Sequence, residues 1–133
     1  MSMEKKQIFK CKVCGLVIEV LDGCSCPAIL ECCGKPMELQ TAQTADTRAE
    51  KHVPFPTVLE QGGMRVTVGE ATLHPMTDAH YIQWIEVCNG PYVTRKYLKP
   101  GDPPHADFHV QLQKGMKVRE YCNVHGLWEY NIN

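Results

Sequence analysis

The cysteines and histidines of this chain occupy different parts of the sequence. Six of the eight cysteines precede residue 34, and all six histidines follow residue 51. Clustered cysteines in a reducing compartment are more often metal ligands than disulfides. A disulfide framework would require a secretion signal, and the start of the chain, Met1 to Lys10, is charged where a signal peptide is apolar. The division predicts two modules with different metal chemistry.

Composition narrows the class of protein further. The 133 residues are 44% hydrophobic and 22% charged, with a formal net charge of −1, which is normal for a folded soluble chain. This charge gives no electrostatic reason to expect nucleic acid as a partner. The apolar stretch after Cys14 is interrupted by Glu19 and Asp22, so we expect no membrane span and no membrane partner. We therefore expect a cytoplasmic protein.

The domain boundary is predicted near residue 40. The residues before it hold too few large apolar side chains for an independent core, and such a short domain needs metal, disulfides or oligomerisation. The polar stretch Leu39–Ala49 has no apolar periodicity and is typical of a linker. We predict a metal-binding domain at 1–40 and a second domain at 41–133.

The second domain is predicted to be all β. Six short segments are rich in β-branched and aromatic residues or alternate in polarity, and turn-forming residues separate them. No convincing long amphipathic helix accompanies them, so an antiparallel sandwich is expected. The predicted strands are Met64–Val68, Tyr81–Val87, Tyr92–Leu98, Phe108–Leu112, Lys117–Tyr121 and Leu127–Tyr130.

The cysteine-rich part contains one strong metal-binding motif. Cys11 and Cys14 form a C-x-x-C knuckle, and the adjacent Cys32 and Cys33 offer a second pair. Adjacent side chains tend to point in opposite directions, so the second pair must lie in a distorted turn to reach one ion. Four thiolates suit zinc or a single iron, and the sequence does not separate the two. Three roles are open for the two further cysteines, Cys24 and Cys26. They are spectators without a metal, they replace one of the expected ligands, or they form a redox-sensitive thiol pair.

The histidine-rich part suggests a second metal site. His74 precedes a proline, which places it in extended or turn backbone, and Cys122 with His125 has the spacing of a chelating pair. His52 and His80 complete four candidate histidines. Such a donor set suits iron, copper or zinc, although blue copper and catalytic zinc use fewer histidines. Two others are interpreted as surface residues, His105 and His109.

Several motifs, in order along nearly the whole chain, resemble those of desulfoferrodoxin, the two-iron form of superoxide reductase. They are Phe9-Lys-Cys11, Cys32-Cys33-Gly34-x-Pro36-Met37, Glu50-Lys-His-Val-Pro54, His74-Pro-Met-x-x-x-His80, Ile82-x-Trp84-Ile85-Glu86, Lys99-Pro-Gly-Asp102 and Arg119-Glu-Tyr-Cys-Asn-x-His-Gly126 with Trp128. One departure concerns the segment between Cys14 and Cys32, which is longer than the family pattern and adds Cys24 and Cys26.

The resemblance implies a rubredoxin-like small domain followed by an immunoglobulin-like antiparallel β-sandwich, with one mononuclear non-haem iron in each. It implies reduction of superoxide to hydrogen peroxide, a rubredoxin-like electron donor and a homodimer. By the resemblance, Glu50 and Lys51 lie beside the open position of the second iron. The implied ligands of the catalytic iron are His52, His74, His80, Cys122 and His125, and those of the first iron are Cys11, Cys14, Cys32 and Cys33.

Two other functions remain as alternatives. One is an electron carrier whose Fe(Cys)4 centre is the working site. The other is a zinc-stabilised binding module, which would be colourless. Superoxide reductase is the favoured hypothesis. The positive charge of Lys51 is expected to attract the superoxide anion and to stabilise the negative charge that develops on the bound product.

Overall fold

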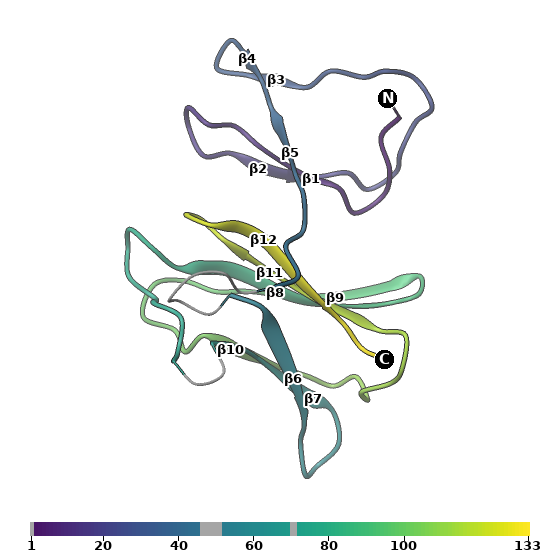
Figure 1. Cartoon of the computed structure of the whole chain (residues 1–133), viewed down its shortest axis with the longest axis vertical. Coiled ribbons are helices and arrows are strands. Elements are labelled where there is room, and N and C mark those ends of the chain that lie inside the picture. Colours follow the sequence, from purple (N-terminus) through teal and green to yellow (C-terminus); the bar gives the residue numbers. More distant parts are fainter. Residues whose placement is uncertain (1, 46–51, 70–71) are drawn as a thin grey trace. The chain divides into compact units, whose positions relative to one another are not determined.

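The computed structural model describes residues 2–45, 52–69 and 72–133 of the chain (Figure 1). These residues form strands and turns, and no helix occurs among them. They divide into two compact units, Met1–Thr41 and Ala42–Asn133. An all-β chain was predicted, and this prediction is confirmed.

The first unit contains a three-stranded antiparallel sheet and a small hairpin. The sheet has the order β2-β1-β5, and β3 pairs with β4. Only Ile8 and Cys11 are buried among the described residues of this unit. The strands are β1 (Ile8–Lys10), β2 (Val17–Glu19), β3 (Glu31–Cys32), β4 (Lys35–Pro36) and β5 (Glu38–Gln40).

The predicted linker was wrong at its start. Leu39 lies in β5, where it pairs with Phe9 of β1, so the polar stretch begins inside a strand. Gln43 also has ordered backbone pairing, since its N–H donates to the Leu127 carbonyl at 2.9 Å. The sequence gives little sign that Leu39 belongs to a strand, because β5 has only three residues and its side chains are largely exposed.

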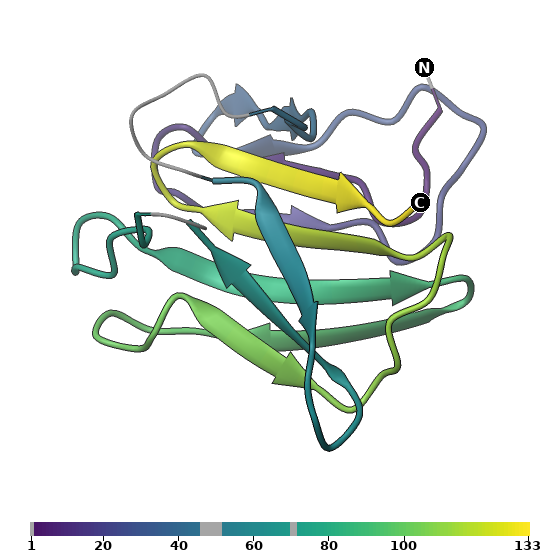
Figure 2. The same cartoon turned by 60° about the horizontal axis from the view of Figure 1, so that its bottom comes forward.

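The second unit is a sandwich of two antiparallel sheets (Figure 2). One sheet has the order β10-β7-β6 and the other the order β12-β11-β8-β9. The strands are β6 (Pro54–Val58), β7 (Met64–Val68), β8 (Ile82–Asn89), β9 (Tyr92–Tyr97), β10 (His105–Phe108), β11 (Lys117–Cys122) and β12 (Gly126–Asn131).

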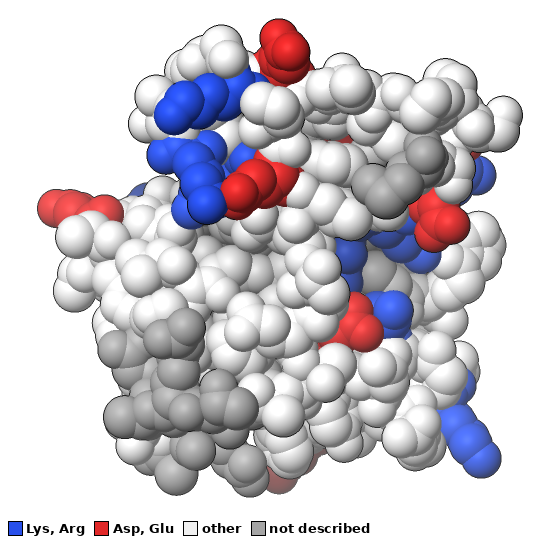
Figure 3. Space-filling model, turned by 45° about the horizontal axis from the view of Figure 1, so that its top comes forward, with Lys and Arg blue, Asp and Glu red and all other residues white. Residues whose placement is uncertain are grey.

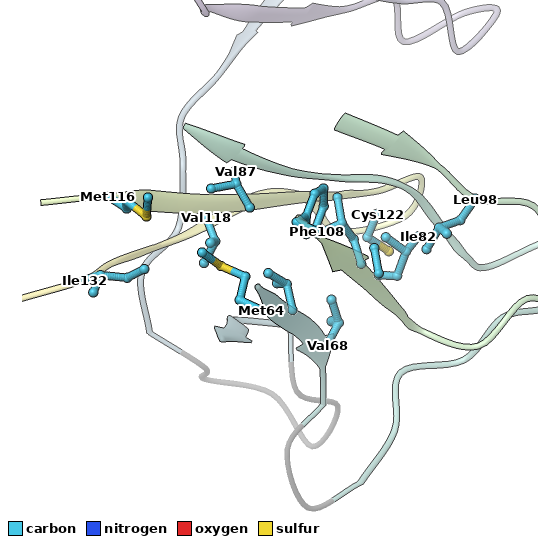
Figure 4. Close-up of a cluster of buried hydrophobic side chains, with 13 residues drawn as sticks. Met64, Val68, Ile82, Val87, Leu98, Phe108, Met116, Val118, Cys122 and Ile132 are labelled. Atoms are coloured by element: carbon cyan, nitrogen blue, oxygen red, sulfur yellow. The ribbon is translucent and has the colours of Figure 1, made fainter. Parts of the chain in front are cut away.

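The core of the second unit lies between these two sheets. Along β7, the side chains of Met64, Val66 and Val68 are fully buried, and the two residues between them are less so. This alternation is what a strand with one face on the core requires. Figure 4 shows Cys122 beside Ile82 at one end of the cluster. A residue with metal-binding chemistry therefore belongs to the hydrophobic core itself.

Five of the six predicted strands occur close to their expected bounds, and two details differ. The predicted strand Phe108–Leu112 was placed too late, because β10 ends at Phe108. Strand β6 was missed since Pro54 and Pro56 interrupt it and proline is rare inside a sheet. It lies at the edge of its sheet, where unpaired backbone positions accommodate proline.

Charged side chains of both signs are scattered over the face drawn in Figure 3, with broad uncharged areas between them. This agrees with the near-zero net charge of the chain. Across the described part of the chain there is no helix with the length and apolar character needed to span a membrane.

Candidate metal centres

Four cysteines of the first unit bring their sulfurs together. The Sγ atoms of Cys11, Cys14, Cys32 and Cys33 all lie within 4.8 Å of one another. Cys14 Sγ is 3.6 Å from Cys32 Sγ, and Cys32 Sγ is 3.8 Å from Cys33 Sγ. Four converging thiol groups have the chemistry of a tetrahedral site for zinc or iron.

Two tight turns produce this convergence. After Cys11, the carbonyl of that residue accepts a hydrogen bond from Gly15 N at 2.9 Å, and Gly15 has φ of +82°. In the β3–β4 hairpin, the two-residue loop is Cys33-Gly34, with φ of +54° and +75°. Positive φ at both positions is the type I′ geometry of tight hairpins. The distorted turn expected for adjacent cysteines is confirmed, since it lets both thiols face one point.

The thiols of this cluster interact strongly with one another. Hydrogen bonds from backbone N–H groups, that of Cys14 first, lower the pKa of Cys11 to about 6. The pKa of Cys32 is raised to about 12, because its thiol is hydrogen-bonded to Cys11 and Cys14. One thiolate is therefore favoured and a second beside it is disfavoured. A bound cation would remove that conflict, since it stabilises every thiolate that it contacts.

Cys24 and Cys26 do not join this cluster. Their sulfurs are 3.4 Å apart, and neither is among the four that converge. Of the alternatives left open by the sequence, replacement of a ligand by either residue is not what the structure shows.

In the second unit, four histidine rings form a closed four-sided arrangement. Neighbouring ring centroids are 4.7 Å apart for His52 and His74, 4.8 Å for His74 and His80, 5.0 Å for His80 and His125, and 4.6 Å for His125 and His52. Each neighbouring pair is nearly perpendicular, whereas the diagonal pair of His52 and His80 is 6.4 Å apart and close to parallel. This is the arrangement of four imidazoles placed around one central point.

The sulfur of Cys122 belongs to the same cluster. Donor atoms of His52, His80, Cys122 and His125 lie within 4.8 Å of one another. Cys122 is fully buried, and His125 N donates a hydrogen bond to its Sγ at 3.4 Å. Such a backbone hydrogen bond tunes the charge on a metal-binding thiolate.

The backbone around His74 fixes its ring. His74 lies shortly after β7, where a Cβ on Gly69 would be 2.7 Å from the backbone nitrogen of His74. Only glycine permits this approach at φ of +89°. His74 Nδ1 is 2.7 Å from the Pro75 carbonyl oxygen, so this ring nitrogen donates and carries the proton. The buried Nε2 is then the nitrogen with an electron pair for a metal.

His80 and His125 are positioned by loops that are tied together. The turn from Thr77 to His80 is closed by reciprocal backbone hydrogen bonds of 2.9 and 3.2 Å. Asn123 then links this turn to the β11–β12 hairpin, because its Oδ1 accepts from Tyr81 N at 2.9 Å and its Nδ2 donates to the Ala79 carbonyl at 3.1 Å. The role of Asn123 was missed from the sequence, where the motif Cys122-Asn-Val-His125 was its only signal.

The β11–β12 hairpin carries both Cys122 and His125. The pairing of β11 with β8 shifts by one residue between Tyr121 and Cys122, which is a β-bulge, and bulges re-aim side chains next to active sites. Gly126 has φ of +85° and closes the loop.

Trp128 of β12 supports two of the rings. Its ring stacks on that of His52 at 4.7 Å and 17°, and its Nε1 donates to the His125 carbonyl at 3.2 Å. His52 is fully buried shortly before β6. A buried imidazole with an aromatic wall has its orientation fixed without a metal.

The remaining predicted residues have different outcomes. Glu50 and Lys51 lie outside the described residues. His105 is part of β10 and half-buried, and His109 is exposed after that strand. Neither joins the ring cluster. His109 agrees with its interpretation as a surface residue, whereas His105 is only partly exposed.

The donor set of the second unit fits a transition-metal ion. Neutral imidazoles and a thiolate are borderline and soft donors, which favour iron, copper or zinc over magnesium or calcium. Four imidazoles exceed the three protein ligands of catalytic zinc sites and the two histidines of blue copper sites.

Both parts of the chain, each with its cluster of candidate metal ligands, are similar to known proteins. The desulfoferrodoxin family matches residues 44–131, and the desulfoferrodoxin N-terminal domain matches residues 3–40. The chain is 52% identical to a desulfoferrodoxin homolog of Methanothermobacter thermautotrophicus, over 94% of this chain and 98% of the relative. It is 32% identical to a superoxide reductase of Thermococcus kodakarensis, over 70% of this chain and 95% of that protein.

A solved structure extends the similarity to the fold. The superoxide reductase from Treponema pallidum matches with a TM-score of 0.72 and 25% identity, over 94% of this chain and 97% of that chain. The similarity spans both units, and the chain therefore belongs to the desulfoferrodoxin family.

Proposed function

We propose that this chain is a superoxide reductase, an oxidoreductase that reduces superoxide by one electron to hydrogen peroxide without releasing dioxygen. The observation that carries the proposal is the closed arrangement of four buried or half-buried imidazoles with one buried thiol. Relatives over most of the chain are superoxide reductases. Removal of superoxide in this way would serve antioxidant defence.

Iron is the proposed metal in both clusters. The proposed ligands in the second unit are His52, His74, His80, Cys122 and His125, and those in the first are Cys11, Cys14, Cys32 and Cys33. When bound as the ferrous ion, the second iron supplies the electron and an open coordination position for a small anion. The chain supplies the two features that this chemistry needs, a shielded thiolate and fixed imidazoles.

The burial of Cys122 has a direct chemical consequence. An exposed thiolate would be stabilised by water and would react with peroxide, whereas this sulfur lies in the hydrophobic core (Figure 4). The hydrogen bond from His125 N withdraws some of its charge. The chain thus keeps an electron-rich ligand while limiting its oxidation.

Glu50 and Lys51 are proposed as the residues that handle the substrate. They immediately precede His52, a proposed iron ligand, in the sequence, and this supports the proposal. A lysine ammonium group attracts superoxide and stabilises negative charge that develops on the product. Glu50 is proposed to occupy the open position in the oxidised state.

The first iron is proposed to pass electrons from an external rubredoxin-like donor. Cys14 and Cys33 are exposed, so a donor protein can approach this cluster closely. We further propose a homodimer, since the first unit exposes Val13, Leu16 and Leu39 and buries little of its own. A cytoplasmic location is proposed because none of the eight cysteines, all of which the structure describes, forms a disulfide.

The function is tested by stopped-flow mixing of the reduced, iron-loaded protein with superoxide. Fast oxidation of the second iron, followed by its visible absorption, is expected. If only the Fe(Cys)4 centre changes oxidation state, the chain is an electron carrier and the reductase proposal fails. Sedimentation showing only monomer at micromolar concentration would contradict the proposed dimer.

A further inference from the structure

Two cysteines of the first unit form a separate pair outside both metal clusters. Cys26 Sγ lies 3.4 Å from Cys24 Sγ, and Cys24 Sγ is 3.6 Å from the Cys26 carbonyl oxygen. Both residues are exposed. Their spacing is C-x-C, and the four sulfurs that converge on the first metal site do not include them. These thiols are therefore available for chemistry with small molecules.

The backbone holds Cys24 in place on one side of the pair. Cys24 and Met3 exchange backbone hydrogen bonds of 3.0 and 3.1 Å. The preceding Gly23 lies so close to Met3 that a Cβ would be 2.0 Å from the Met3 carbonyl oxygen. This contact needs glycine, and it keeps the Cys24 backbone against another segment.

The other side of the pair is constrained as well. Pro27 follows Cys26 and fixes its own φ, and Ala28 N donates to the Cys26 carbonyl at 2.9 Å. The two thiols are thus held at near-contact distance by the fold.

The two thiols differ in acidity. The hydrogen bond from the Cys26 thiol lowers the pKa of Cys24, and the same interaction raises the pKa of Cys26. Cys24 is therefore the better nucleophile, and Cys26 keeps its proton. An exposed thiol of lowered pKa beside a second thiol is the arrangement of redox-active cysteines, in which the second one resolves the first oxidation product.

We propose that Cys24 and Cys26 are a peroxide-reducing dithiol, with Cys24 as the attacking thiolate and Cys26 as the resolving thiol. The part of this proposal in which the peroxide is the product of this chain's own reaction rests on the proposed superoxide reductase function. The pair would then consume part of the product that the second metal centre releases.

The chemistry balances in two steps. Cys24 thiolate attacks one oxygen of hydrogen peroxide, so an S–O bond forms, the O–O bond breaks and hydroxide leaves. Cys26 then attacks the Cys24 sulfenic acid, the S–S bond forms, the S–O bond breaks and water leaves. The proton that Cys24 released on ionising converts the hydroxide to water, so in total two thiols are oxidised and one peroxide is reduced to two waters. A dithiol reductant returns the pair to its reduced state.

The sequence allows this pair to be followed separately from the iron ligands. Cleavage after glutamate releases Val20–Glu31, whose only cysteines are Cys24 and Cys26. The iron-loaded full chain is treated with hydrogen peroxide, quenched with an alkylating reagent, digested and measured by mass spectrometry. We expect this peptide to lose two hydrogens and to take up no alkylating reagent, and dithiothreitol to restore both thiols.

Two matched variants assign the roles. In Cys26→Ser, the reaction stops at a Cys24 sulfenic acid that dimedone traps, whereas Cys24→Ser forms neither sulfenic acid nor disulfide. Both variants keep the visible spectra of the two iron centres, which shows that they fold. Peroxide that leaves both thiols of Val20–Glu31 alkylatable would overturn the proposal. So would peroxide consumption by Cys24→Ser at the wild-type rate, or a third metal ion per chain that both variants lose.

Adding superoxide in a parallel experiment separates the two claims. If superoxide is not reduced but added peroxide still oxidises the pair, the proposed function fails and the dithiol stands. If superoxide is reduced and Val20–Glu31 remains a dithiol under both treatments, the dithiol proposal fails alone.

Discussion

Contacts within the protein hold two rings of the histidine cluster and the backbone of a third histidine. His74 donates from Nδ1 to the Pro75 carbonyl, and His52 stacks on Trp128. The carbonyl of His125 accepts hydrogen bonds from Trp128 Nε1 and from Gln43 Nε2 at 2.9 Å. Orientation fixed before the metal binds lowers the entropy lost on binding, so these contacts raise metal affinity.

The thiolate of Cys122 is expected to be essential to the second centre. Cys122→Ser replaces a soft donor with a weak one, and we expect loss of the thiolate-to-iron visible absorption and about one iron fewer per chain. The matched control is Cys88→Ser, which changes the other buried cysteine of this unit, hydrogen-bonded to Glu86 at 3.3 Å. Absorption spectra and metal analysis of both variants make the measurement. Equal iron retention by the two would exclude Cys122 as a ligand.

Lys51 is expected to accelerate the approach of superoxide. We predict that Lys51→Ala slows the second-order reaction about tenfold at low salt and weakens its dependence on ionic strength. Lys114→Ala removes another lysine, exposed and in a turn, and should leave rate and salt dependence unchanged. A Lys51→Ala rate equal to that of the control, with the same slope against ionic strength, would contradict the steering role.

At the scale of elements, one buried carboxylate ties three strands together. Glu86 of β8 is bound by Arg119 of β11, with Nε at 2.6 Å from Oε2, and by Arg95 of β9, with Nε at 2.8 Å from Oε1. The Arg95 guanidinium also lies over the Trp84 ring, 4.8 Å from its centroid. Burial alone raises the pKa of Glu86, but the two guanidinium groups outweigh it, and the net pKa is below its usual range.

We therefore predict that Glu86→Gln destabilises the second unit by about 3 kcal/mol at neutral pH, because it leaves the buried Arg119 and the half-buried Arg95 poorly compensated. The control is Asp107→Asn, whose exposed pair with Arg65 is worth about 1 kcal/mol or less. Urea unfolding followed by the fluorescence of Trp84 gives both values. Similar losses in the two variants would contradict the assignment.

The pH dependence of this effect has a definite sign. A carboxylate with a lowered folded-state pKa stabilises the fold above the ordinary pKa, here 4.5, and loses that contribution as pH falls through the lower folded value. The stability difference between wild type and Glu86→Gln should accordingly be largest near neutral pH and shrink on acidification below about 4.5. A difference that grows on acidification would contradict this origin.

Elements with regular alternation were predictable, and irregular ones were not. The strand Met64–Val68 was located from sequence because its apolar and polar residues alternate, and its burial alternates in the same way. Strand β6 was not predicted, because Pro54 and Pro56 make the segment look unlike a strand. It is a strand at the edge of its sheet, where proline is tolerated. The spacing of cysteines and histidines predicted the Cys11–Cys14 and Cys122–His125 pairs, and the family resemblance implied the full ligand sets. The hydrogen bonds of Asn123 join residues about forty positions apart and leave no local pattern.

At the scale of the whole molecule, the two units depend on metal to different degrees. The second has a core of thirteen buried side chains, and among described residues the first buries only Ile8 and Cys11. A unit with so small a core needs the free energy of metal binding to stay folded. We predict that stripping the metal with a strong chelator unfolds the first unit and leaves the second folded.

Limited trypsin digestion followed by mass spectrometry tests this prediction. After chelation, cleavage at Lys10 and Lys12 should become at least tenfold faster, while cleavage at Lys96 within β9 should change little. Restoring iron should restore protection. Equal protection of the first unit with and without metal would show that its fold does not depend on a metal ion in the four-cysteine cluster.

The central claim is that the second centre reduces superoxide and does not dismutate it. The most direct measurement is the product yield during steady turnover of the iron-loaded protein with a reduced electron donor, using a peroxide assay and an oxygen electrode. In the absence of a dithiol reductant, which limits the Cys24–Cys26 pair to one peroxide per chain, reduction predicts one hydrogen peroxide for each superoxide consumed, no dioxygen release and one donor electron used each time. Dioxygen release with half as much peroxide, or no superoxide consumption above the Cys122→Ser background, would contradict the account.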